Sequence, residues 1–171
     1  MKSRLVLLAI ALFAVMSVSA FAQSSEQATA DAEAKIVAGI SVTKINDMKF
    51  GQIVRSASAG TVVLSAEKGD RTATGGVTLG LADGARAAEF TVAGEPAYSF
   101  ALTLPTSISL TKKGSSATLT VSNFTSTLTG DAGILDGNGE ASFNVGADLS
   151  VAANQETGVY NGDFTVVAAY N

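Results

Sequence analysis

Apolar residues occupy every second position near the start of the chain. From Ala28 to Val42 the even positions hold only Ala, Ile or Val, and Val37 is the one large apolar side chain at an odd position. A period of two is typical of a strand with one buried face. A short helix over residues 25–38 is the alternative, because alanine is the best helix former. We expect the strand from Ala34 onward and a flexible or extended segment over residues 23–33.

The same alternation ends the chain. The even positions before the terminus are all apolar: Phe164, Val166, Ala168 and Tyr170. Chain ends usually fray, because terminal backbone has few contacts to offset the entropy lost on ordering. We therefore expect a final strand whose even-numbered side chains pack into a core as far as the penultimate residue.

Between these two segments, short β-branched runs alternate with turn-forming residues. No convincing amphipathic helix interrupts the runs, and their one-face-apolar pattern is typical of antiparallel sheets. The expected strands are residues 60–66, 71–74, 88–93, 98–104, 117–124, 141–145, 149–152 and 164–170. We predict an all-β fold, with residues 34–171 forming a single β-sandwich domain of two packed sheets.

The first 22 residues have the three parts of a secretory signal peptide. Two positive charges in residues 1–4 precede an apolar run over residues 5–18, and Ala20-Phe21-Ala22 forms a small-x-small cleavage site. No later stretch approaches the ~20 apolar residues of a spanning helix. We expect export to the periplasm, cell surface or exterior, with no membrane insertion after the signal peptide is removed.

Composition narrows the possible chemistry. The chain has no Cys and no His, and its net charge is −4. Disulfides, imidazole-based catalysis and most zinc or copper sites are therefore excluded. An acidic chain also lacks the basic footprint that nucleic acids require. We predict no catalytic, cofactor-binding or metal site, no cofactor, and no nucleic-acid partner.

Two groups of acidic residues were considered as sites. Residues 136–140 read Asp-Gly-Asn-Gly-Glu, like the start of a calcium loop, but Ala141 stands where that loop requires Gly. We predict a turn there. A glycoside hydrolase would need two carboxylates at a defined separation, and the sequence does not bring any pair together. We therefore expect no enzyme; the carboxylates considered are Asp47, Asp70, Asp131 and Asp148.

A series of short elements is spaced along the chain. They are Phe50-Gly51, Gly60-Thr61-Val62, Gly75-Gly76, residues 88–94, Tyr98-Ser99, Val145-Gly146, and Gly158-x-Tyr160-x-Gly162-x-Phe164 before Tyr170-Asn171. In this order they resemble a secreted bacterial family catalogued as a domain of unknown function, over residues 34–171. The resemblance implies an immunoglobulin-like antiparallel β-sandwich, export, and no established activity.

The C-terminus also resembles that of pilin subunits from the chaperone-usher pathway. Gly158 is fourteenth from the end and Tyr170 is second, with alternating apolar residues between them. The resemblance implies a pilin-like sandwich that lacks a strand, and whose exposed edge binds a periplasmic chaperone and then a neighbouring subunit. The C-terminal edge candidates are Gly158, Tyr160, Phe164, Val166, Ala168 and Tyr170. The strand-donor candidates are Ile36, Ala38, Ile40 and Val42.

These observations favour an exported structural or adhesive surface protein. The leading hypothesis is a fimbrial, pilin-like subunit that self-associates by β-strand donation. The alternative is a self-complete periplasmic or extracellular binding module, whose own N-terminal strand closes the sandwich. Packing of Ile36, Ile40 and Val42 against their own core would favour the alternative.

The signal-peptide interpretation predicts the N-terminus of the exported protein. Cleavage after Ala22 leaves Gln23 as the first residue, because small residues occupy both recognition positions of the site. Mass spectrometry of the exported chain measures this directly. An exported protein that still begins at Met1 would contradict the interpretation.

Overall fold

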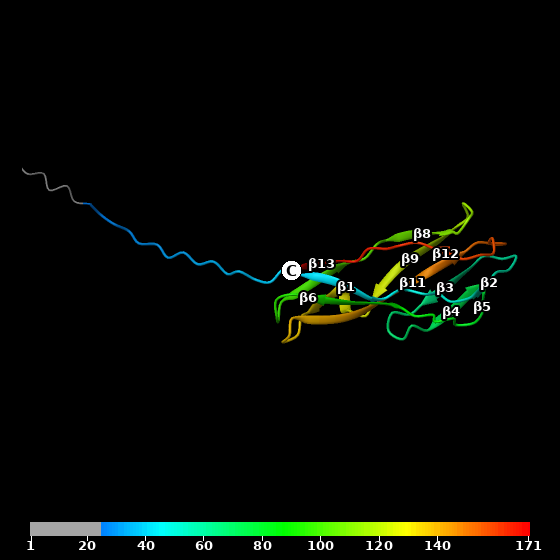
Figure 1. Ribbon diagram of the computed structural model, residues 1–171, viewed down its shortest axis with the longest axis horizontal. Helices are drawn as coiled ribbons and strands as arrows, with labels where there is room; N and C mark the ends of the chain where they lie inside the picture. Colours follow the sequence, from blue (N-terminus) through cyan, green and yellow to red (C-terminus); the bar gives the residue numbers. More distant parts are fainter. Residues whose placement is uncertain (1–24) are drawn as a thin grey trace, which may run out of the picture. The chain divides into compact units, whose positions relative to one another are not determined.

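The computed structural model describes residues 25–171, and the signal peptide predicted over residues 1–22 lies outside them (Figure 1). The chain forms two units, Met1–Lys35 and Ile36–Asn171. In the first, residues 25–35 are exposed and have no regular secondary structure. Among the described residues, no helix has the length and apolar character needed to cross a membrane.

The second unit is built from strands and one short 3-10 turn. The elements are β1 Ser41–Asn46, β2 Ile53–Val54, β3 Gly60–Leu64, β4 Arg71–Gly75, β5 Thr78–Leu79, β6 Ala88–Ala93, β7 Ser99–Thr103, β8 Ser107–Lys112, β9 Thr118–Ser126, η1 Thr129–Asp131, β10 Ala132–Ile134, β11 Glu140–Val151, β12 Tyr160–Asn161 and β13 Val167–Tyr170. All pairings between them are antiparallel.

One layer is an eight-stranded sheet with the order β1-β6-β11-β9-β8-β12, in which β3 also pairs with β11 and β4 pairs with β3. The long central strand β11 organises it. On one edge its first half pairs with β6 and its second half with β3, while β9 occupies the other edge. The register shifts between Gly146 and Asp148, which marks a bulge where β11 changes partner.

The other layer consists of two small sheets, β10-β7-β13 and β2-β5. Figure 1 shows β13 and the β2–β5 pair at opposite ends of the large sheet. The first covers a core cluster around Phe90, Phe100 and Phe143, and the second lies over a cluster around Val121 and Leu149. The all-β fold and its antiparallel sandwich architecture are therefore confirmed.

Most predicted strands are present, with three differences. Residues 88–93 match β6, whereas residues 141–145 and 149–151 belong to one continuous strand, β11. The strand expected over residues 164–170 begins only at Val167, because residues 164–166 pair with no other strand. The strand expected from Ala34 begins only at Ser41. Ser41 pairs with the last residue of β6, Ala93, so β6 offers no backbone partner to the residues before it.

The acidic loop after β10 forms the predicted turn. The Oδ1 atom of Asp136 accepts hydrogen bonds from the backbone N–H groups of Asn138 at 2.8 Å and Glu140 at 2.9 Å. These bonds hold the pKa of the Asp136 carboxyl below its usual range. Nowhere in residues 25–171 do three metal-ligating side chains cluster.

The bulge in β11 predicts a strong glycine requirement. A Cβ atom at Gly146 would lie 2.2 Å from the Leu64 carbonyl oxygen, whereas one at Gly137 would meet open space. Gly146→Ala should therefore lower the free energy of unfolding by about 2 kcal/mol or more, because β3 would have to move. Gly137→Ala, the matched control, should change it by less than about 0.5 kcal/mol. Urea denaturation of both variants tests this, and equal midpoints would contradict it.

Candidate functional site

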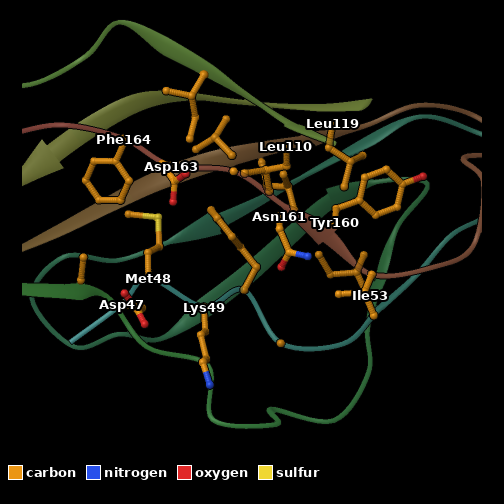
Figure 2. A pocket seen from close by; sticks show the side chains of 18 of the residues that line it. Asp47, Met48, Lys49, Ile53, Leu110, Leu119, Tyr160, Asn161, Asp163 and Phe164 are labelled. Carbon is orange, nitrogen blue, oxygen red and sulfur yellow. The ribbon is translucent and has the colours of Figure 1, made fainter. Parts of the chain in front are cut away.

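A cleft of about 1400 Å³ opens beside the large sheet, lined on two sides by residues from 42–55 and from 155–166. It exceeds the roughly 300–1,000 Å³ typical of small-molecule sites. Its floor is the inward face of the large sheet, where Leu119, Val121 and Leu149 are buried. In Figure 2, Leu110, Leu119 and Tyr160 line one part of the cleft and Phe164 and Met48 line another. The lining combines these apolar side chains with charged ones, among them Lys49, Arg55 and Asp163.

The C-terminal segment forms one wall of the cleft. Its even-numbered side chains are half-buried, and the odd-numbered residues between them are exposed. Phe164 packs edge-on against Phe90, with ring centroids 6.0 Å apart, and lies 5.2 Å from the ring of Phe124. The predicted inward alternation at the C-terminus is present. The half-buried residues are Tyr160, Phe164, Val166, Ala168 and Tyr170.

The backbone of this segment is hydrogen-bonded along only one edge. The N–H of Asn171 donates to the Ser99 carbonyl at 3.2 Å, and the N–H of Lys113 donates to the Val159 carbonyl at 3.0 Å. Along an antiparallel strand, the backbone N–H and C=O groups of successive residues point to opposite edges. The backbone groups of the odd-numbered residues therefore point toward β7 and β8, and those of the even-numbered residues point toward the opposite edge. That opposite edge faces away from both partner strands.

Five residues in the middle, Gly162–Val166, belong to no strand ladder. β12 pairs with β8 before them and β13 pairs with β7 after them, so the chain passes here from the large sheet to a small one. The β13 register would place Thr165 opposite Pro105, which has no N–H to donate. The middle of the C-terminal wall is therefore extended backbone with unused pairing capacity.

The opposite wall comes from the chain that follows β1. Met48 packs against both core clusters, and Lys49 forms an isolated bridge with Arg86. At the rim, Lys44 and Asp47 form an exposed ion pair at 2.5 Å. The pair's hydrogen bond and opposite charges raise the pKa of Lys44 and lower that of Asp47. Both signs of charge are present, so the rim does not select strongly for a charged ligand.

A hydrogen-bonded clasp holds the Tyr170 side chain to the backbone just before β1. The hydroxyl of Tyr170 donates to the Ala38 carbonyl at 2.9 Å and accepts from the Glu95 N–H at 2.7 Å. The Glu95 carboxylate in turn accepts from the Ala38 N–H at 3.0 Å. Gly94 leaves room for the phenol, because a Cβ there would lie 2.2 Å from the Tyr170 oxygen. The clasp ties the penultimate residue to the backbone that enters β1.

The four strand-donor candidates occupy different environments. Ile36 is 94% exposed, whereas Ile40 and Val42 pack against the core cluster of their own chain. Ala38 is exposed but held by the clasp. The structure thus divides the predicted donor segment into an outer part before Ala38 and an inner part that belongs to its own sandwich.

Gly158 lies at the far end of the C-terminal wall from the clasp. Its φ is 153°, and a Cβ there would lie 2.5 Å from Cε of Lys112. Lys112 also forms an ion pair with Glu156. The glycine therefore allows the chain to pass close to β8 before β12 begins.

Three of the four acidic candidates for catalysis have separate partners. Asp131 accepts from the Ser126 hydroxyl at 2.6 Å, and Asp148 accepts from the Asn123 amide at 2.9 Å. Asp47 bonds to Lys44. None of the hydrogen bonds described joins two of these carboxylates.

Sequence reasoning missed the wall after β1. Met48 and Phe50 continue the even-numbered apolar positions of β1, but Lys44 and Asn46 interrupt the series. The interruption coincides with a register shift between Lys44 and Asn46, where the chain leaves β6. The two apolar residues beyond the break are the signal that could have located this wall.

The fold is an antiparallel β-sandwich with an open cleft beside the inward face of its large sheet. The chain belongs to the family described as a domain of unknown function, DUF4402, whose match covers residues 40–170. No curated protein and no solved structure matches the chain.

The clasp predicts a local effect of removing one oxygen atom. Tyr170→Phe keeps the ring contact with Tyr98 but loses both hydroxyl hydrogen bonds. We expect a loss of about 1–2 kcal/mol in the free energy of unfolding, and faster amide exchange at Ala38 and Glu95. Tyr160→Phe is the matched control, because its hydroxyl bonds to Gln155 and Glu156 instead. Unchanged exchange at Ala38 and Glu95 in Tyr170→Phe would contradict the clasp.

Proposed function

We propose that the protein is an exported structural or adhesive surface subunit whose cleft accepts a β-strand from another chain. The observation that carries the proposal is that residues 162–166 pair with no other strand and lie beside an apolar floor. A strand added there gains main-chain hydrogen bonds from the edge and burial from the floor. No catalytic chemistry is part of this role.

An open strand edge over apolar residues has a physical reason to be covered. Unpaired strand edges promote aggregation unless they are blocked, bent or occupied. This edge carries no proline, and its only charged residue is Asp163. A transient partner, such as a periplasmic chaperone, would cover this surface first, and another subunit would then replace it.

The segment before the clasp is the best candidate for the added strand. Residues 25–37 are exposed, and their even positions from Ala28 to Ile36 are apolar. Donation of the inner residues would require β1 to leave β6, with which it shares five paired positions. The proposed donor therefore lies before Ala38 and does not include the candidates Ile40 and Val42.

A second candidate is a self-complete binding module. Packing of Ile40 and Val42 against their own core favours it, because β1 already closes one side of the sandwich. In that case the cleft would hold a ligand rather than a strand, and the protein would remain a monomer at all concentrations. Exposure of Ile36 favours strand donation.

A peptide tests whether the cleft accepts a strand. The peptide spanning residues 28–43 contains every donor candidate. At about one hundred times its Kd it should stabilise the mature protein by about 2.7 kcal/mol. For a chain of this size we expect a rise in Tm of roughly 5–10 °C. Differential scanning calorimetry measures the shift, and no shift at saturating peptide would contradict the proposal.

Proline at the free edge provides the matched comparison. Val166→Pro removes an N–H that points away from β7, and should abolish most of the peptide-induced shift. Val166→Ala shortens the same side chain but keeps the N–H, and should retain most of it. Circular dichroism verifies that both variants are folded. Equal shifts in the two variants would show that binding does not use this edge.

A further inference from the structure

Met48 projects into the cleft that an added strand would enter. It lines the cleft, is half-buried, and contacts both core clusters, as Phe124 also does. In Figure 2 its side chain points from the wall after β1 toward Phe164 on the opposite wall. Methionine is unbranched and flexible, so it fills irregular gaps and can adjust when a neighbour arrives.

The side chains of the proposed donor are unusually small. Four of its five inward positions are alanine, and only Ile36 is large. Alanine side chains would fill little of a deep groove, so they would bury little apolar area in a wide part of the cleft. Where the Met48 side chain projects into the cleft, an added strand requires small side chains, because extra methylene groups in a packed space force neighbours to move.

We infer that Met48 is the size filter of the cleft, and that the occupant it selects is the alanine-alternating segment, residues 28–36, of a second copy of this chain. This inference rests on the proposed function, since it names the partner of the same site. Donor and acceptor are different surfaces, so the contact is head-to-tail and can extend into a chain of subunits. Large side chains in the donor are excluded wherever they would face Met48.

A size-exchange experiment tests the filter. The probes are peptides of residues 25–37 in which Ala28, Ala30, Ala32 or Ala34 is singly replaced by Leu. Binding to the mature wild-type protein is measured by isothermal titration calorimetry. We expect at least one Leu peptide to bind about tenfold or more weakly than the natural sequence. Met48→Ala should restore its binding to within about threefold of the natural peptide, because the missing side chain leaves room for the leucine.

Two controls separate size from other effects. Met48→Leu conserves volume and should discriminate against the same Leu peptide as the wild type does. Leu at the outward positions Thr29 or Glu33 should bind equally well to wild type and Met48→Ala. Calorimetric unfolding of each variant shows whether it is folded before titration.

The outcomes distinguish this inference from the proposed function. If the natural peptide binds wild type but not Val166→Pro, and all four Leu peptides bind wild type normally, the cleft accepts a strand and the filter is wrong. Failure of Met48→Ala to restore any Leu peptide overturns the filter as well. If the natural peptide does not bind at all, both are overturned. If Met48→Ala restores the binding of a Leu peptide at just one of the four alanine positions, that result supports the filter and identifies the register of the donor.

Discussion

The backbone hydrogen bonds of β11 are the interaction on which the rest of the structure depends. This strand pairs with β6 and β3 along one edge and with β9 along the other. The change of partner occurs where Gly146 allows the β3 backbone to approach within a distance that no side chain would permit. Because both core clusters include residues of β11, the two ends of the sandwich are joined through this one strand.

The cleft follows from how the second layer is built. Its two small sheets cover separate core clusters, and no strand ladder joins them across the middle. The C-terminal segment spans this gap, but its middle residues leave one sheet before joining the next. One backbone edge is therefore unpaired directly beside apolar side chains. In the proposed function, a strand supplied by another chain would pair with this edge and cover the apolar side chains.

The elements that could be predicted are those that depend on the residues of one short segment. The β6 strand and the C-terminal alternation were found because each has a period of two over apolar residues. The turn at residues 136–140 was found from its Gly and Asn content. The short strands β2, β5, β10 and β12 were missed, because two or three residues carry no measurable period and become strands only through their partners. The N-terminal strand was placed too early for the same reason, since its alternation continues beyond the end of β6. The six-residue strand β8 was missed as well, although Ile108 and Leu110 alternate with polar residues in it.

The sequence by itself determined the all-β class, the inward face of the last strand and the absence of imidazole and thiol chemistry, since these follow from residue types and their spacing. Tertiary structure alone decided that Ile40 and Val42 belong to their own core while Ile36 does not. It also decided that the Tyr170 hydroxyl bonds to Ala38 and Glu95 and that Met48 lines the cleft. Register between distant strands sets these relations, and register depends on which backbone edges meet in space rather than on any pattern along one segment.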